Sequence, residues 1–220
     1  MQEERVRFPS GEADPVQLEG VLHTPVGGDC SLPGVVLCHP HSLHGGYMHV
    51  PVMKATAREL AARGLIALRF NFRGVGRSEG TFGDGVAEVA DVKGAVDFLR
   101  DHGDVDTSRL YLMGYSFGAA VGLRCVEEGL PVSAVVALCL PLAEVTILPL
   151  GEKFWYKWAK PKLFLAGDRD DICPLSELQP LVERLPEPKQ LTVLEGADHF
   201  LWGREQEVAG HVAQYLGGIS

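Results

Sequence analysis

Two segments of the chain carry a serine between glycines in the pattern G-x-S-x-G, at residues 114–118 (GYSFG) and 76–80 (GRSEG). A serine in this pattern can serve as a nucleophile when it stands on a sharp turn between a strand and a helix. Its hydroxyl reacts well only if an imidazole removes the proton. The pattern alone does not choose between the two serines.

The neighbouring residues favour Ser116. It directly follows an apolar run at residues 110–113 and precedes Phe-Gly-Ala-Ala-Val, a helix start with small residues that lets strand and helix approach closely. Ser78 is separated from the preceding apolar run and is followed by the glycine-rich residues 79–85, which cannot begin a helix. We therefore predict Ser116 as the nucleophile and Ser78 as a loop residue. A serine that merely caps a core helix is the alternative for Ser116.

A carboxylate to orient the imidazole is expected after a later strand. The apolar run at residues 163–166 is followed by Gly-Asp-Arg-Asp-Asp, which offers three aspartates. Asp168 is close enough to the strand end to cap a turn. Asp170 stands three residues after the glycine, just ahead of residues that would anchor the loop. We predict Asp170 as the acid, with Asp171 as the alternative.

His199 is the predicted base. It lies just past the apolar run at residues 191–194 and before a final helical segment. Among the eight histidines, it alone follows both the serine and the aspartate as well as a strand end. The order Ser, Asp, His is the one that this arrangement of strands requires.

The segment after the apolar run at residues 35–38 is rich in histidine, with the sequence His-Pro-His-Ser-Leu-His-Gly-Gly. Pro40 has no N–H, so the first backbone donors belong to His41 and Ser42. We expect the N–H groups of His41 and Phe117 to form an oxyanion hole, and Ser42 to line the substrate pocket. No carboxylate or cysteine pattern accompanies these histidines, so we predict no metal site.

The candidate site residues must be positioned by secondary-structure elements. Along the chain, predicted strands alternate with predicted helices. The expected strands are residues 35–38, 65–70, 109–113, 132–140, 162–166 and 191–194. The expected helices are residues 52–63, 86–99, 117–128 and 205–216. This alternation predicts an α/β fold with a mostly parallel sheet and helices on both faces, preceded by an antiparallel edge hairpin at residues 5–8 and 16–23. Ligands bind beyond the carboxyl ends of such strands. We expect one domain over residues 1–220.

Composition excludes several classes of partner. The formal net charge of −9 disfavours nucleic acid and anionic membrane surfaces. The start of the chain does not resemble a signal peptide, and no apolar run is long enough to span a bilayer, so a cytoplasmic location is expected. The five cysteines are scattered, and Cys38 and Cys139 lie in apolar runs typical of buried side chains.

Taken together, these motifs resemble the α/β-hydrolase superfamily, and in particular the small dienelactone-hydrolase-like esterases. The resemblance rests on His39-Pro40-His41 with Gly45-Gly46, on residues 69–76 (RFNFRGVG), on the GYSFG turn and on residues 196–200 (GADHF). It covers nearly the whole chain. It implies an eight-stranded sheet whose second strand is antiparallel, and cofactor-free transfer of an acyl group to water.

One departure concerns the nucleophile, because dienelactone hydrolases carry a cysteine where this chain has Ser116. The difference favours ordinary ester hydrolysis. Only residues 141–161 separate two of the expected strands at the place where related enzymes insert a large lid, so we expect none. Trp155 and Trp158 fall in this segment and could line an acyl pocket or cover the sheet edge. An uncovered site suits short acyl groups.

The sequence thus predicts a carboxylesterase that cleaves small, short-acyl esters through Ser116, His199 and Asp170. A thioesterase or an acylaminoacyl-type peptidase would use the same three residues. A non-catalytic binding protein on the same fold is the rival from another class. The oligomeric state is left open by the sequence.

Overall fold

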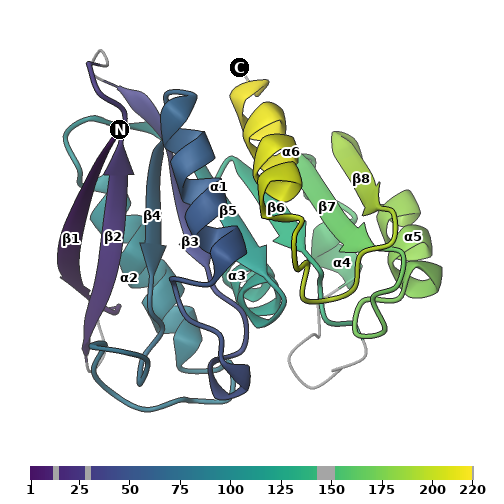
Figure 1. Cartoon of the computed structure of the whole chain (residues 1–220), viewed down its shortest axis with the longest axis horizontal. Coiled ribbons are helices and arrows are strands. Elements are labelled where there is room, and N and C mark those ends of the chain that lie inside the picture. The colour runs from purple at the N-terminus through teal and green to yellow at the C-terminus, as the bar shows by residue number, and fades with distance from the viewer. Residues whose placement is uncertain (12–14, 28–30, 143–151, 220) are drawn as a thin grey trace.

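The computed structural model describes residues 1–11, 15–27, 31–142 and 152–219. A twisted eight-stranded sheet lies at its centre (Figure 1). The strands are β1 (Gln2–Pro9), β2 (Gln17–Thr24), β3 (Leu32–Cys38), β4 (Ile66–Phe70), β5 (Val105–Tyr115), β6 (Ala134–Leu138), β7 (Lys162–Gly167) and β8 (Lys189–Leu194). The helices are α1 (Pro51–Ala62), α2 (Glu88–Arg100), α3 (Phe117–Glu127), α4 (Glu152–Trp155), α5 (Leu175–Arg184) and α6 (Glu205–Gly217), with a 3-10 turn η1 at Ser42–His44.

The order of the strands across the sheet is β1-β2-β4-β3-β5-β6-β7-β8. Strand β2 runs antiparallel to both β1 and β4, and every other pair of neighbours from β4 to β8 is parallel. This confirms the predicted fold class, including the antiparallel second strand. The parallel strands all point their carboxyl ends to one edge, which is where a ligand site is expected.

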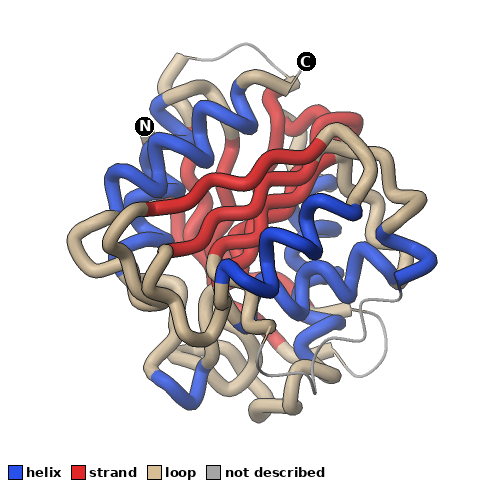
Figure 2. Tube along the Cα trace, turned by 90° about the vertical axis from the view of Figure 1, so that its right-hand side faces the viewer, coloured by secondary structure: helices blue, strands red, loops and turns tan. Residues whose placement is uncertain are grey.

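Helices cover both faces of the sheet. Figure 2 shows the strands lying between the two layers of helices. Helices α1 and α6 pack on one face, whereas α2, α3 and α5 pack on the other. Strand β3 illustrates why both faces are apolar: Val36 and Cys38 enter the core on one side, and Val35 and Leu37 enter the core on the other. A continuous apolar run is therefore what this central strand requires.

Helix α5 was not expected from the sequence. Only Leu178 and Val182 of this ten-residue helix are buried, and Pro180 lies inside it. A proline in a helix interior removes a hydrogen bond and ordinarily indicates a helix end. Packing of the short apolar face against the sheet outweighs that preference here. The helix directly follows the loop that carries Asp170, so it fixes one end of that loop.

The connection from β6 to β7 occupies only residues 139–161 and contains the short helix α4. A connection of this length has no room for a large lid domain, in agreement with the prediction. In the part of the chain that the structure describes, no helix is long and apolar enough to cross a bilayer. The cysteines at 38, 125, 139 and 173 are all buried and unbridged.

Candidate active site

Ser116 occupies a strained turn between β5 and α3. Its backbone φ and ψ are 52° and −118°, a positive-φ conformation that is costly for a residue with a Cβ. The turn needs small neighbours: a Cβ on Gly114 would collide with the backbone of Gly118, and one on Gly118 would collide with the carbonyl of Cys38. This geometry matches the turn that the sequence predicted at residue 116.

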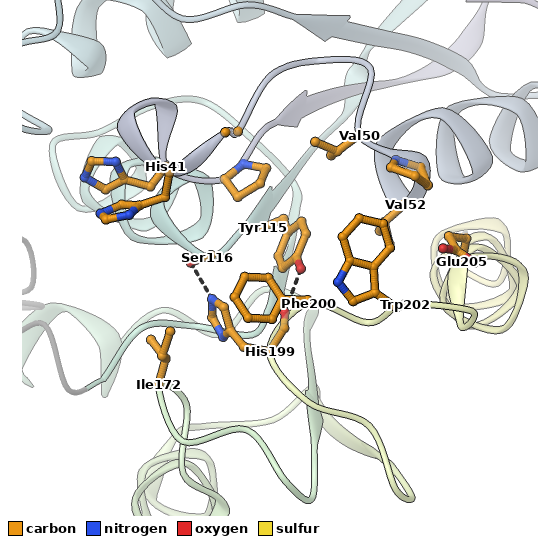
Figure 3. Close-up of a pocket in the computed structure, with 15 residues that line it drawn as sticks. His41, Val50, Val52, Tyr115, Ser116, Ile172, His199, Phe200, Trp202 and Glu205 are labelled. Atoms are coloured by element: carbon orange, nitrogen blue, oxygen red, sulfur yellow. Dashed lines mark hydrogen bonds between the residues drawn. The ribbon is translucent and has the colours of Figure 1, made fainter.

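Three side chains form a hydrogen-bonded chain at this turn, although they lie far apart in the sequence. The Oγ of Ser116 is 2.8 Å from Nε2 of His199. On the other side of the ring, Nδ1 of His199 is 2.8 Å and 2.9 Å from the two carboxylate oxygens of Asp170. Because a carboxylate only accepts, Nδ1 carries the imidazole proton and Nε2 is left to accept from the serine hydroxyl. Figure 3 shows the contact of Ser116 with His199.

All three residues are nearly enclosed: Ser116 is 7% exposed, Asp170 3% and His199 9%. Each follows the carboxyl end of a parallel strand, namely β5, β7 and β8 respectively. The structure thus brings together the serine, aspartate and histidine that the sequence singled out. Low exposure strengthens the electrostatic interactions among them relative to water.

The Asp170 carboxylate is held by several donors. Its Oδ1 accepts hydrogen bonds from the backbone N–H groups of Ile172 (2.9 Å) and Cys173 (2.8 Å). Burial alone would raise the pKa of the Asp170 carboxyl, but its interaction with His199 and the hydrogen bonds from the Cys173 N–H and the Cys139 thiol together hold this pKa below its usual value. The group is therefore an ionised acceptor at neutral pH.

The other two aspartates of this loop have different surroundings. Oδ1 of Asp168 accepts the N–H of Gly196 at 2.7 Å, which ties the loop after β7 to the loop after β8. Asp171 is exposed. Among the three, only Asp170 contacts the imidazole of His199.

Tyr115 positions His199 and was not singled out from the sequence. Its hydroxyl donates a hydrogen bond of 2.6 Å to the backbone carbonyl of His199. Burial, reinforced by nearby acidic groups, raises the pKa of Tyr115, so the hydroxyl stays a donor. The sequence offered one signal for this role, which is that Tyr115 directly precedes Ser116. A residue at that place must lie close to the loops that carry Asp170 and His199.

The histidine-rich loop lies against the start of α3. The rings of His41 and Phe117 are 4.9 Å apart. A Cβ on Gly46 would collide with the carbonyl of Pro40, so the loop closes tightly on itself. Phe117 is the first residue of α3, and its N–H has no acceptor within the helix. The side chains of His41 and Phe117 thus pack together next to Ser116, and the oxyanion role of their backbone N–H groups stays a prediction.

His39 has a structural role in the same loop. It is fully buried, and its two ring nitrogens contact the carbonyl of Pro40 (2.6 Å) and the N–H of Phe72 (3.1 Å). Burial lowers its pKa to about 4, so the ring is neutral. A neutral imidazole with one donor and one acceptor suits these two backbone groups.

A cavity of about 270 Å³ opens beside Ser116. Its surface is mainly apolar, and Ser116 and His199 are part of its wall (Figure 3). The lining residues are Pro40, His41, His44, Gly45, Gly46, Val50, Pro51, Val52, Tyr115, Ser116, Ile172, His199, Phe200, Trp202 and Glu205.

Three residues that the sequence predicted for the substrate pocket, Ser42, Trp155 and Trp158, do not line the cavity in the structure. Ser42 lies in η1, and its hydroxyl is buried outside the cavity lining. Trp155 is the last residue of α4 and is buried in the core, where its ring lies 5.4 Å from that of Trp158. The Nζ of Lys162 approaches the Trp158 ring at 5.4 Å. These two tryptophans pack against the hydrophobic core and do not line the cavity.

The aromatic and acidic residues that do line the cavity were missed. Phe200 and Trp202 follow His199 by one and three positions, and Glu205 begins α6. Their closeness to the base in sequence was a usable signal. Val50 and Val52, by contrast, come from the start of α1 and reach the cavity only through the packing of the fold.

One cluster has the residue types of a metal site. Potential ligand atoms of Cys139, Asp170 and His199 lie within 4.8 Å of one another, and all three residues are buried. Burial and the neighbouring Asp170 charge raise the pKa of the Cys139 thiol well above its usual value, which disfavours the thiolate that a metal needs. His199 Nδ1 is also hydrogen-bonded to the Asp170 carboxylate, so both groups already have a partner. We interpret the cluster as part of the hydrogen-bond network around the acid.

A serine on a strained strand-to-helix turn, followed in chain order by an aspartate and a histidine after later strands of an eight-stranded sheet, defines the α/β-hydrolase class of proteins. The chain belongs to this class: the family described as an alpha/beta hydrolase domain matches residues 34–214.

Individual relatives agree with this assignment. An uncharacterized protein of Rickettsia prowazekii is 32% identical over 189 residues, which cover 84% of this chain and 78% of that protein. An alpha-beta serine hydrolase homologue from Coxiella burnetii has a similar structure, with a TM-score of 0.80, 31% identity and 97% of each chain covered. A serine hydrolase without a lid from Xanthomonas campestris also has a TM-score of 0.80, at 27% identity, with 98% of this chain and 94% of that one covered.

Proposed function

We propose that the protein is a carboxylesterase that cleaves small, short-acyl esters with Ser116 as nucleophile, His199 as base and Asp170 as orienting acid. The single observation that carries this proposal is the unbroken chain of hydrogen bonds from the serine hydroxyl through the imidazole to the carboxylate. A binding protein on the same fold would have no need to keep all three groups aligned and buried at a strained turn.

The reaction proceeds in two halves. Nε2 of His199 takes the proton of the Ser116 hydroxyl while Oγ attacks the ester carbonyl, and the tetrahedral intermediate expels the alkoxide, which takes the same proton. Water then enters, gives a proton to Nε2 and attacks the acyl-serine; the bond between the acyl carbon and Oγ breaks, Oγ takes the proton back from Nε2, and the carboxylic acid is released. Asp170 holds Nδ1–H and stabilises the imidazolium that forms in each half.

The negative oxygen of the intermediate is stabilised by the backbone. The N–H groups of Phe117 and His41 are the proposed donors, aided by the positive end of the α3 dipole. Losing one such donor costs about 2.7–4 kcal/mol of transition-state stabilisation. Because these are backbone groups, side-chain replacement does not remove them.

The dimensions of the cavity support small substrates. Its volume of about 270 Å³ lies below the usual range for sites that take drug-sized ligands, roughly 300–1,000 Å³. The mainly apolar wall favours uncharged acyl groups of a few carbons, and the short connection between β6 and β7 adds no large lid that would shield a long chain.

A panel of matched acetyl and butyryl substrates tests the proposal. p-Nitrophenyl esters, the corresponding thioesters and the anilides are offered to the wild type, to Ser116→Ala and to Ser78→Ala. We expect the esters to be the best substrates, with turnover reduced on the order of 10⁴–10⁶-fold in Ser116→Ala. Ser78→Ala is the control because Ser78 stands in the same sequence pattern but bonds to the backbone of Asn71 and Glu19.

Preferred hydrolysis of thioesters or anilides would reassign the substrate class while keeping the three residues in their roles. Full activity of Ser116→Ala, or loss of activity in Ser78→Ala with Ser116→Ala unaffected, would overturn the proposal.

A further inference from the structure

One end of the active-site cavity is built differently from the rest. Figure 3 shows Trp202 and Glu205 on the side away from His41, with Phe200 between them and the Ser116–His199 pair. The end therefore combines two aromatic rings with a carboxylate in a cavity whose surface is otherwise mainly apolar. Glu205 is half-buried and therefore places its negative charge at this end of the cavity.

The Glu205 carboxylate has no ion pair within the described part of the chain. Its Oε1 accepts the backbone N–H of Gly203 at 3.2 Å. The nearest cation in sequence, Arg204, is engaged elsewhere: its Nη1 donates to Glu207 at 2.7 Å and its Nη2 donates to the carbonyl of Glu195. Glu205 also begins α6, where the helix dipole stabilises a negative charge. The cavity thus has a carboxylate at one end that protein cations do not neutralise.

The two aromatic rings at this end are unusually exposed. Trp202 is 70% exposed and Phe200 58%, although both are large apolar side chains that ordinarily pack in a core. An indole face attracts a cation placed within about 6 Å of its centre, and the interaction strengthens when water is excluded. Exposed rings beside a carboxylate provide both features that hold an organic ammonium group.

Resting on the proposed esterase function, we propose that this end of the cavity is a subsite for an ammonium group on the alcohol part of the ester. The alcohol side is assigned because the leaving alkoxide must receive its proton from Nε2 of His199, and Phe200 and Trp202 follow His199 by one and three positions. The preferred substrates are short-acyl esters of amino alcohols.

Two acetate esters of the same shape isolate the charge. Choline acetate carries a trimethylammonium group, and 3,3-dimethylbutyl acetate carries a tert-butyl group in its place. The measured quantity is the kcat/KM for choline acetate divided by the kcat/KM for 3,3-dimethylbutyl acetate. Glu205→Gln is expected to lower this ratio about tenfold, the change that ~1.4 kcal/mol of binding free energy produces. Trp202→Leu is expected to lower it as well, because the aromatic face is lost.

Glu207→Gln is the matched control. Glu207 lies in the same first turn of α6 and carries the same charge, but it pairs with Arg204 and is absent from the cavity wall. It should leave the ratio unchanged. A ratio that is unchanged in Glu205→Gln, or one that falls equally in Glu207→Gln, overturns the subsite, since the second result indicates only the general field of an acidic protein.

Binding is measured separately from turnover with the Ser116→Ala protein. Choline and 3,3-dimethylbutan-1-ol are titrated while the indole N–H resonance of Trp202 is followed by NMR. Tighter binding of choline, reduced by Glu205→Gln, supports the subsite even if neither ester is hydrolysed, in which case only the esterase proposal fails. Hydrolysis of both esters without any preference of the protein for choline leaves the esterase standing and removes the subsite.

Discussion

At the residue scale, the position of one imidazole proton governs the proposed chemistry. Asp170 fixes that proton on Nδ1 of His199, which leaves Nε2 facing the serine hydroxyl. The carboxylate itself is kept in place by two backbone N–H groups of its own loop. A side chain of the same shape that donates instead of accepting would favour the opposite tautomer.

Asp170→Asn is therefore expected to lower kcat on the order of 10⁴-fold, the size of the effect known for the equivalent change in a serine protease, while the fold is retained. The adjacent Asp171→Asn serves as the control, because Asp171 is exposed and does not contact His199. Steady-state kinetics on a short p-nitrophenyl ester check this. Similar losses in both variants would mean that Asp170 is not the orienting group.

The three members of this hydrogen-bonded chain could be predicted because each follows a strand end in a fixed chain order. Most residues of the cavity wall could not be predicted in this way. Trp155 was a candidate because of its place in the chain, yet it lies in the core, where a large apolar ring gains most from burial. Trp202 and Glu205 lie close to His199 in the sequence, but only the structure shows that these side chains line the cavity.

At the scale of elements, the strand-to-helix turn depends on how closely β5 and α3 approach. Gly118 in the first turn of α3 faces the carbonyl of Cys38 on β3 without room for a methyl group. The parallel pairing of β3 with β5 fixes the position of that carbonyl. The backbone of α3 cannot retreat without moving the Phe117 N–H.

Gly118→Ala should consequently reduce esterase activity strongly, whereas Gly122→Ala in the same helix should not. At Gly122 an added Cβ would meet only the Leu112 side chain, at 3.1 Å, and alanine gains about 1 kcal/mol in helix propensity over glycine. Thermal unfolding and kinetics of the two variants provide the measurement. An active, stable Gly118→Ala protein would show that the close approach is not required.

Among the elements, the central strands and the helices α1, α2, α3 and α6 were predicted from apolar runs and helical spacing. Helix α5 was not, because Pro180 inside it contradicts local preference and only tertiary packing reveals it. Strand β5 begins at Val105, earlier than the apolar run at residues 109–113 indicated, because its first residues pair with the start of β3.

At the scale of the whole molecule, two buried histidines connect stability to pH. His23 bonds to Arg69 through Nε2 at 2.8 Å, and His39 bonds to the backbone. Burial lowers the pKa of each to about 4, from an ordinary value of 6.5, and for His23 the Arg69 charge adds to the effect. In the unfolded chain both rings bind a proton near pH 6.5, whereas in the folded protein they do so only near pH 4.

The unfolded state therefore binds more protons between these values, and the free energy of unfolding must fall as pH decreases from about 6.5 to 4. Each histidine contributes up to about 1.4 kcal/mol per pH unit in that window. His23→Gln keeps an acceptor for Arg69 but cannot titrate, so its stability should fall less steeply. Urea unfolding at pH 6.5, 5.5 and 4.5 tests this, and equal slopes for the variant and the wild type would refute it.

The whole account depends on Ser116 being a nucleophile activated by its surroundings. A fluorophosphonate reagent reacts with serine hydroxyls that are activated in this way and leaves ordinary ones unmodified. We expect mass spectrometry of the labelled native protein to find one adduct, on the peptide that contains Ser116, and none in Ser116→Ala or in the urea-unfolded chain. An unmodified native protein, or an adduct on another serine such as Ser78, would contradict the central claim.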